Sequence, residues 1–283
     1  MSDHVLGQWN PEVGWRSHLA RSRLGLQWVI SNLRLQLPKA IVLWAFNLEG
    51  CLTTVHGIKI RIAKGDLTPV ARQYYVDTLK VLGFSVREVS QGLFDVELPA
   101  GVTLRVPEAQ LFPLVEIYGD NVYLVEGIDL GGKNVIDVGT SVGDSTVFFA
   151  SKGAQVLGIE CLPSIAQLAR YNVSRNRLDA QVTILTKRFV GKPSNESNSI
   201  DLEGAMAVGL MKSVEVLKLD CDGCESNVIL NTADQVLNRV RRFLVEYDSP
   251  PAPMIHKLDK LGYITRRVGG AHTGYLYASK RAS

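Results

Sequence analysis

A glycine-rich turn follows an apolar run near the middle of the chain. The run is Val135-Ile136-Asp137-Val138, and the chain continues as Gly139-Thr140-Ser141-Val142-Gly143-Asp144. Glycine permits a sharp turn without a side-chain clash, and its small size lets a ligand or a helix approach the backbone. The pattern predicts a strand, a turn and a helix that together bind a ligand. The candidate binding residues are Asp137, Gly139, Thr140, Ser141, Gly143 and Asp144.

The side chains after the turn limit the kind of ligand. A nucleoside triphosphate site would need a lysine where Asp144 stands, and a dinucleotide site would need a glycine in place of Ser141. A carboxylate behind Gly143 would also repel a pyrophosphate. A cationic cofactor without phosphates suits the turn better, so S-adenosyl-L-methionine is predicted. We also expect Asp144, Ser145 and Thr146 to offer cap oxygens to the helix that follows.

Glu160 supports this prediction. It ends the next apolar run, 23 residues after Asp137. A carboxylate at the end of a second strand can accept hydrogen bonds from both ribose hydroxyls of an adenosine. Glu160 is therefore a further candidate cofactor-binding residue. Glycine turns after strands occur in many α/β proteins, so a purely structural turn is the alternative.

A second polar segment, Lys218-Leu-Asp-Cys-Asp-Gly-Cys-Glu225, follows another apolar run. Carboxyl ends of strands line the crevice of a doubly wound sheet, so these side chains are expected to face the glycine turn. Asp220 is a candidate for holding the cofactor or the substrate, and Asp222 or Glu225 for accepting a proton. All three are the predicted catalytic residues. A loop with merely solvated charges is the alternative interpretation.

Metal chemistry is not predicted. Cys221 and Cys224 form a C-x-x-C pair, but Cys51 and Cys161 lie elsewhere and no second pair exists. The histidines form no pair with metal-ligand spacing. The function of the thiol pair is left open.

The elements that must position these residues follow from hydrophobic periodicity. Helices with a basic face are predicted between Trp15 and Leu33, with Pro38 as an interruption. A strand over residues 58–63, a helix from Thr68 to Gly83 and short strands near Val86, Val96 and Val102–Val106 come next. Residues 1–110 are therefore predicted to form a helical and α+β recognition or lid region.

From about Val122 onward, apolar runs alternate with helical patterns, as in a parallel sheet. The runs are Val135–Val138, Val156–Ile159, Val182–Leu185, Val214–Leu219 and Phe243–Val245. Gly269-Gly270 between two strand-like runs predicts a terminal antiparallel hairpin. Residues 111–283 are thus predicted to be an α/β cofactor-binding domain.

Composition narrows the class further. The 283 residues carry 31 Lys+Arg against 28 Asp+Glu, a formal charge of +3, and 46% are hydrophobic. The longest apolar stretch, around Ala40–Phe46, is far short of the roughly 20 residues of a bilayer span, so no membrane span is expected. The N-terminus lacks a signal-peptide pattern, and four unpatterned cysteines favour a reducing cytoplasm.

The motifs together resemble those of the FkbM-type class I S-adenosylmethionine-dependent methyltransferases. The resemblance covers roughly Phe112–Lys280 and includes the 135–146 segment, Leu157–Pro163, Tyr171-Asn172 with Asn176, and Leu217–Glu225. It implies a seven-stranded Rossmann-like sheet with an antiparallel last strand. It also implies that Asp137, Gly139 and Gly143 form the cofactor loop and Glu160 holds the ribose, while Asp220 and Glu225 face the reaction. Thr140-Ser141 replaces the usual Ala-Asn, and Asp222 replaces a glutamate.

The predicted function is methyl transfer to a hydroxyl of a small molecule or glycoconjugate. One alternative is methylation of RNA or protein, with the basic N-terminal region as an anchor. Another is a non-catalytic α/β module that binds a nucleotide or nothing. No oligomeric state is predicted.

Overall fold

The computed structural model describes residues 33, 37–53, 59–62, 68–99, 101–123 and 128–280. These divide into two compact units, one with residues 102–105 and the chain from Tyr123 onward, the other with the described chain up to Gly101 and residues 106–122. The helices expected between Trp15 and Leu33 lie outside the described residues, apart from Leu33 itself.

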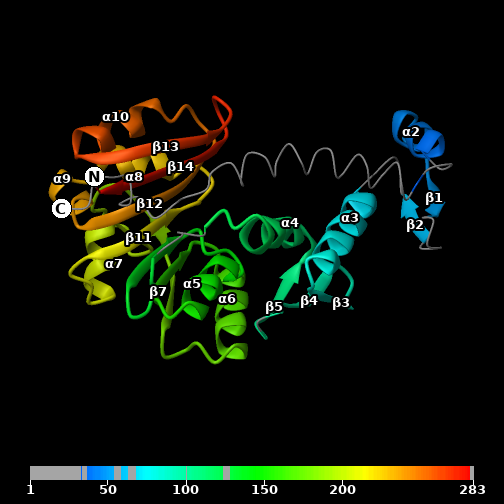
Figure 1. The fold of residues 1–283 in the computed structure, drawn as a ribbon, viewed down its shortest axis with the longest axis horizontal. Helices are drawn as coiled ribbons and strands as arrows, with labels where there is room; N and C mark the ends of the chain where they lie inside the picture. The colour runs from blue at the N-terminus through cyan, green and yellow to red at the C-terminus, as the bar shows by residue number, and fades with distance from the viewer. Residues whose placement is uncertain are drawn as a thin grey trace, which may run out of the picture. The chain divides into compact units, whose positions relative to one another are not determined.

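A seven-stranded sheet forms the centre of the first unit (Figure 1). Its order is β13-β14-β12-β11-β6-β7-β8. The strands β8, β7, β6, β11 and β12 pair in parallel, and β14 is antiparallel to both β12 and β13. The bounds are β6 Asn134–Val138, β7 Gln155–Glu160, β8 Val182–Thr186, β11 Val214–Leu219, β12 Val240–Tyr247, β13 Tyr263–Gly269 and β14 Gly274–Lys280. The predicted sheet with its reversed last strand is confirmed.

Helices connect and cover these strands. They are α5 Asp144–Ser151, α6 Pro163–Arg175, α7 Leu202–Val208, α8 Glu225–Asn231, α9 Asp234–Leu237 and α10 Ala252–Lys260. Helices α5 and α6 pack on each other and on β7, whereas α10 packs on α8 and β13. The central strands are apolar on both faces because both are covered; Ile136, Leu217 and Phe243 are completely buried.

The chain reverses its direction across the sheet at β6. From β6 it proceeds through β7 to β8, and then returns to β11 and β12 on the other side of β6. In open α/β sheets, ligands bind at such a switch point, beyond the carboxyl ends of the strands. Both polar segments identified from the sequence follow strands at this point, after β6 and after β11.

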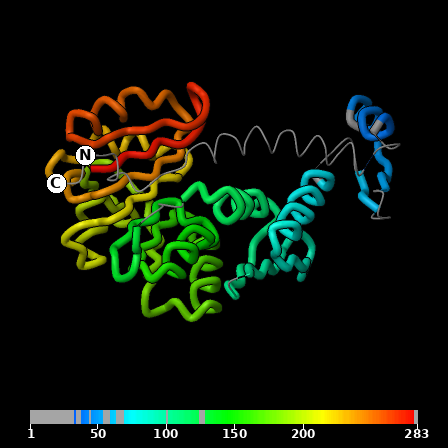
Figure 2. The backbone as a smooth tube through the Cα atoms, viewed as in Figure 1, coloured from blue at the N-terminus to red at the C-terminus, as the bar shows by residue number. Residues whose placement is uncertain are grey.

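The predicted terminal hairpin is also confirmed. Figure 2 follows the chain from β12 through α10 into β13 and β14, which turn at residues 269–274. Tyr247, completely buried at the end of β12, donates a hydrogen bond to the carbonyl of Gly270 at 2.7 Å. This contact attaches the hairpin turn to the end of a central strand. A short parallel pair, β9 Arg188–Phe189 and β10 Ser199–Ile200, borders the loop of residues 190–198.

The second unit is small and mixed. It contains α2 Leu37–Ala45, β1 Gly50–Thr53, β2 Lys59–Ile62, α3 Thr68–Val81, β3 Ser85–Ser90, β4 Leu93–Glu97, the 3-10 turn η2 Glu108–Gln110, α4 Leu111–Leu114 and the π-helical turn η3 Val115–Gly119. Strand β5, Thr103–Pro107, runs from the first unit into the second, and the small sheet has the order β3-β4-β5. The predicted helix and strands of this region are present.

One prediction for this unit stays untested, and one pairing was not predicted. Pro38 lies in α2, but residues 34–36 before it are outside the described residues, so the expected interruption of a helix stays a prediction. Strand β2 pairs with β1, which the sequence analysis did not predict. Among the described helices, none combines the length and the apolar character needed to cross a bilayer.

Candidate cofactor and catalytic site

Residues 139–143, here called the glycine turn, connect β6 to α5. Gly139, Ser141 and Gly143 all have left-handed backbones, with φ values of 71°, 48° and 85°. A side-chain carbon on Gly139 would lie 1.6 Å from the carbonyl oxygen of Asp220, and one on Gly143 would lie 3.2 Å from Cα of Ala169 in α6. The space beside both glycines is therefore occupied by neighbouring protein backbone.

Asp137 anchors the start of α5. It is completely buried, and its Oδ2 accepts hydrogen bonds from the hydroxyls of Ser145 at 2.7 Å, Thr146 at 2.5 Å and Thr140 at 3.1 Å. The prediction that Ser145 and Thr146 cap the helix is wrong, because the buried carboxylate competes for their hydroxyls. The cap position is Gly143, which has no side chain to offer. The Oδ1 atom of Asp144 accepts a hydrogen bond from the backbone N–H of Ser145 at 2.8 Å.

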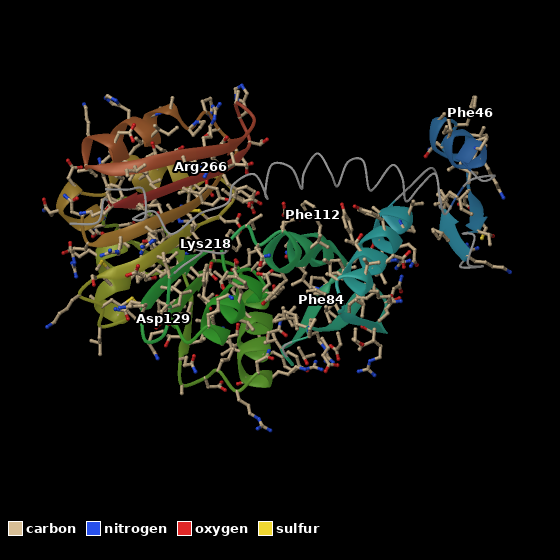
Figure 3. All side chains as sticks on the ribbon, viewed as in Figure 1. Phe46, Phe84, Phe112, Asp129, Lys218 and Arg266 are labelled. Carbon is tan, nitrogen blue, oxygen red and sulfur yellow. A yellow bond between two sulfur atoms is a disulfide. The ribbon has the colours of Figure 1, made fainter. Side chains whose placement is uncertain are left out.

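Lys218 lies at the centre of the site, near the carboxyl end of β11 (Figure 3). Its Nζ lies 3.1 Å from Oδ1 of Asp137 and 3.2 Å from Oδ2 of Asp220. It also donates to the carbonyl of Gly139 at 3.1 Å. Burial would lower the pKa of Lys218, but the neighbouring carboxylates, foremost Asp137, raise it above its usual value. The lysine is therefore charged and holds the two strand ends together.

Tyr123 is a site residue that the sequence analysis missed. Its hydroxyl donates to Oδ2 of Asp220 at 3.0 Å, and its ring lies 5.3 Å from Nζ of Lys218. Burial and then the charge of Asp220 raise the pKa of Tyr123 well above its usual value, so the hydroxyl remains a donor. Asp220 is thus fixed by two donors, while its side chain remains 32% exposed. Among the candidate carboxylates, it combines a fixed position with access to solvent.

Asp144 begins α5 as a nearly buried carboxylate. Burial raises its pKa from 3.8 to about 7, and the nearby charges of Asp137 and Asp220 act in the same direction. Lys218 and the N–H of Ser145 oppose this shift. Near neutral pH the side chain is therefore divided between its neutral and charged forms, and a cation placed nearby would favour the charged form.

Glu160 connects the end of β7 to the glycine turn. Its Oε2 accepts from the backbone N–H of Ser141 at 3.1 Å, and its Oε1 accepts from the N–H of Leu162 at 2.9 Å. The side chain is 8% exposed. An ionised carboxylate has about four lone-pair sites, so each oxygen keeps the capacity for one more donor.

The three predicted catalytic carboxylates occupy different environments. Asp220 lies beside Lys218, whereas Asp222 is exposed at the tip of the loop, with φ of 54°. Glu225 is buried, and its two oxygens accept from the N–H groups of Cys221 at 2.7 Å and Gly223 at 3.0 Å. Burial raises the pKa of Glu225, and these N–H groups partly offset the rise. Glu225 therefore stabilises the conformation of the loop through these two hydrogen bonds.

The loop from Asp220 to Glu225, here called the cysteine loop, also contains a disulfide. The sulfur atoms of Cys221 and Cys224 are bonded, with the Cα atoms 5.6 Å apart. Cys51 and Cys161 are free and exposed. The C-x-x-C spacing is present in the sequence, but the bond between the two cysteines was not predicted from it.

Asn172 supports the glycine turn from α6. It is completely buried, and its amide nitrogen donates to the carbonyls of Val142 at 2.8 Å and Arg105 at 2.9 Å. Its oxygen accepts from the N–H of Arg105 at 2.7 Å. The residue was part of the resemblance, although no role was predicted for it.

Comparison with known proteins found no matching family model and no matching curated protein. Solved structures do match. The methyltransferase domain of METTL16 is 14% identical with a TM-score of 0.48, covering 82% of this chain and 87% of that one. An O-methyltransferase family protein from Burkholderia thailandensis is 13% identical with a TM-score of 0.42, covering 60% and 57%. Magnesium protoporphyrin IX methyltransferase from Synechocystis PCC 6803, solved with bound SAM, is 16% identical with a TM-score of 0.41, covering 76% and 97%.

The strand order and the reversed β14 define the class I methyltransferase fold.

Proposed function

We propose that this chain is an S-adenosyl-L-methionine-dependent methyltransferase of the FkbM type. We propose a hydroxyl of a small molecule or glycoconjugate as the methyl acceptor, and the cytoplasm as the compartment. The observation that carries the proposal is the cluster around Lys218, where Asp137, Asp220 and Tyr123 converge beside the glycine turn.

The charge of this cluster suits a cationic cofactor. Asp137, Asp144 and Asp220 all act on Lys218, so among the described residues of this cluster the carboxylates outnumber the cation. Asp144 has its pKa raised to about 7, which a nearby cation would reverse. When bound, S-adenosyl-L-methionine supplies a methyl group activated by its positive sulfur. Glu160 would hold the ribose through the remaining lone pairs of its two oxygens.

Asp220 is proposed to orient the acceptor hydroxyl and to take its proton. Lys218 and Tyr123 fix the carboxylate by contacts to the same oxygen, Oδ2, and a third of its side chain is exposed. Proton transfer to a positioned carboxylate contributes typically about 100-fold or more to such a rate. Asp222, exposed at the loop tip, is proposed to contact the acceptor, and Glu225 to hold the cysteine loop in place.

The alternatives are supported less well. A phosphate-rich acceptor such as RNA, or a dinucleotide pyrophosphate, would meet the carboxylates of Asp144 and Asp220 in the site. The basic segment proposed as an RNA anchor lies mostly outside the described residues. A hydroxyl of a neutral acceptor encounters no such repulsion.

Transfer of a tritiated methyl group from S-adenosyl-L-methionine tests the proposal. After the reaction, the labelled products should be separated into small-molecule, glycoconjugate, RNA and protein fractions. The label is expected in the first two fractions. Asp220→Asn should lower the transfer by about 100-fold. Asp129→Asn is the matched control, because Asp129 is exposed and precedes β6, at the opposite end of that strand from the glycine turn. Label confined to RNA or protein would refute the proposed acceptor.

A further inference from the structure

The cysteine loop carries a feature that methyl transfer does not require. Cys221 and Cys224 are bonded to each other, on either side of Asp222 and Gly223. Both cysteines are partly exposed, so a reagent in solution can reach them. The pair lies directly between the proposed base, Asp220, and the bracing residue, Glu225.

The backbone between the cysteines is left-handed. Asp222 has φ of 54° and Gly223 has φ of 114°, and aspartate and glycine tolerate this conformation better than most residues. Three restraints maintain it: the disulfide and the two hydrogen bonds from the N–H groups of Cys221 and Gly223 to Glu225. Loss of the covalent restraint would leave a solvent-exposed segment held by hydrogen bonds alone.

The loop is in direct contact with the glycine turn. The place where a side chain of Gly139 would lie is filled by the carbonyl of Asp220, and Cα of Cys221 lies 3.1 Å from it. The N–H of Asp220 also donates to the carbonyl of Val138 at 3.2 Å. A change in the order of the cysteine loop must therefore alter the wall of the proposed cofactor site.

We propose that Cys221 and Cys224 are a reversible redox pair that controls the order of the cysteine loop, with the oxidised form as the ordered one. Reduction transfers two electrons and two protons from a dithiol, cleaves the sulfur–sulfur bond into two thiols, and converts the dithiol to a disulfide. The effect on cofactor affinity rests on the proposed function. The effect on loop order does not.

The proposed cytoplasmic compartment and the C-x-x-C spacing favour a reversible bond. Disulfides in a reducing cytoplasm are mostly transient, with catalytic or sensing roles. Closely spaced C-x-x-C thiols readily exchange with dithiols. A metal is the competing occupant, since the ligand atoms of Cys221, Cys224 and Glu225 lie within 4.8 Å of one another. However, Glu225 already accepts two backbone hydrogen bonds, and bonded sulfurs provide no thiolates.

The first test uses the full chain and needs no cofactor. The protein is treated with dithiothreitol or with its oxidised form, alkylated with iodoacetamide and digested with trypsin, which yields residues 219–239 as one peptide. We expect two alkylated cysteines in this peptide after reduction and none after oxidation. Amide hydrogen exchange of the 219–225 segment should become faster on reduction, because the hydrogen bonds from Cys221 and Gly223 to Glu225 open more often once the disulfide no longer restrains the loop.

The second test measures the affinity for S-adenosyl-L-homocysteine in both states by calorimetry. Reduction should weaken binding by about tenfold. This factor corresponds to the free energy needed to order the backbone of one loop residue when the cofactor binds. Cys221→Ser/Cys224→Ser should bind weakly under both conditions. The matched control is Cys51→Ser, which removes a free, exposed cysteine of the second unit and should retain the full redox response.

The outcomes separate the two proposals. Alkylation at both cysteines after oxidation, thiols protected by copurified zinc, or exchange rates that do not change with reduction would each overturn the redox pair. Equal affinities in the two states would overturn its control of the site. If neither state binds the nucleoside, the proposed function fails, while the thiol and exchange results still decide the redox proposal.

Discussion

The glycine turn and the cysteine loop follow neighbouring parallel strands, β6 and β11, yet they are stabilised by different means. The glycine turn is surrounded by buried polar side chains, with Asp137, Thr140 and Asn172 all completely buried. The cysteine loop has an exposed tip, and its order depends on the carboxylate of Glu225 and on one disulfide. Lys218 joins the two regions through its contacts to Asp137 and Asp220.

The difference indicates that the glycine turn and the cysteine loop have different functions. A site that holds a constant cofactor benefits from a rigid, preorganised turn, because little ordering free energy is then needed on binding. A segment that receives an acceptor or responds to conditions belongs to the less stable parts of a fold. Mutations in the glycine turn should therefore affect the whole domain, and mutations in the cysteine loop should act locally.

The largest effect is expected for Gly139→Ala. The new methyl group would overlap the carbonyl of Asp220, which lies 1.6 Å from its position, and the backbone cannot yield without displacing β11. We expect a loss of unfolding free energy above about 4 kcal/mol in urea titrations. Gly132→Ala is the matched control, with a similar φ of 66° and no atom within 4 Å, and should lose only about 1 kcal/mol. Equal losses of unfolding free energy in Gly139→Ala and Gly132→Ala would show that close contact between the glycine turn and the cysteine loop does not contribute to stability.

Lys218→Met should have the next largest effect. The change leaves Asp137 buried without its counter-ion, and removal of one partner of a buried pair typically lowers the unfolding free energy by about 3 kcal/mol or more. Lys212→Met, at an exposed position before the start of β11, should leave stability within about 0.5 kcal/mol of the original protein. A stable Lys218→Met protein would mean that the lysine does not join the two regions.

The raised pKa of Asp144 predicts that the unfolding free energy depends on pH. Its pKa is raised from 3.8 to about 7 by burial, so the folded chain retains a proton that the unfolded chain loses. This contribution to stability is complete below about pH 4 and disappears as the pH rises through 7, by at most about 1.4 kcal/mol per pH unit. Urea unfolding of Asp144→Asn between pH 5 and about 8 should lack this decline. A decline that persists unchanged in the variant would assign it to another group.

Tyr123→Phe should give the smallest effect. It removes one hydrogen bond to Asp220 and retains the ring, so stability should fall by about 1 kcal/mol. Methyl transfer should fall by up to about tenfold with little change in cofactor affinity, because the tyrosine positions the proposed base. A fall in affinity without a fall in turnover would place Tyr123 in the cofactor site instead.

Most of the large sheet could be predicted from the sequence, because buried parallel strands such as β6 and β11 are uninterrupted apolar runs. The site was predicted where it follows those strands, as with Asp220 and Glu160. Tyr123 was missed because it lies 97 residues from Asp220 in the sequence, and only the folded chain brings them together. The roles of Ser145 and Thr146 were predicted wrongly because local capping preferences take no account of a buried carboxylate on the neighbouring strand.

Calorimetric titration of the full chain with S-adenosyl-L-homocysteine tests the central claim most directly, with Glu160→Gln beside Glu196→Gln as the exposed control. The proposed site predicts saturable binding to the original protein and to Glu196→Gln, with affinity lower by about tenfold or more in Glu160→Gln, because a charged acceptor of the ribose hydroxyls is lost. Absence of binding to the original protein, or equal binding to all three, would contradict it.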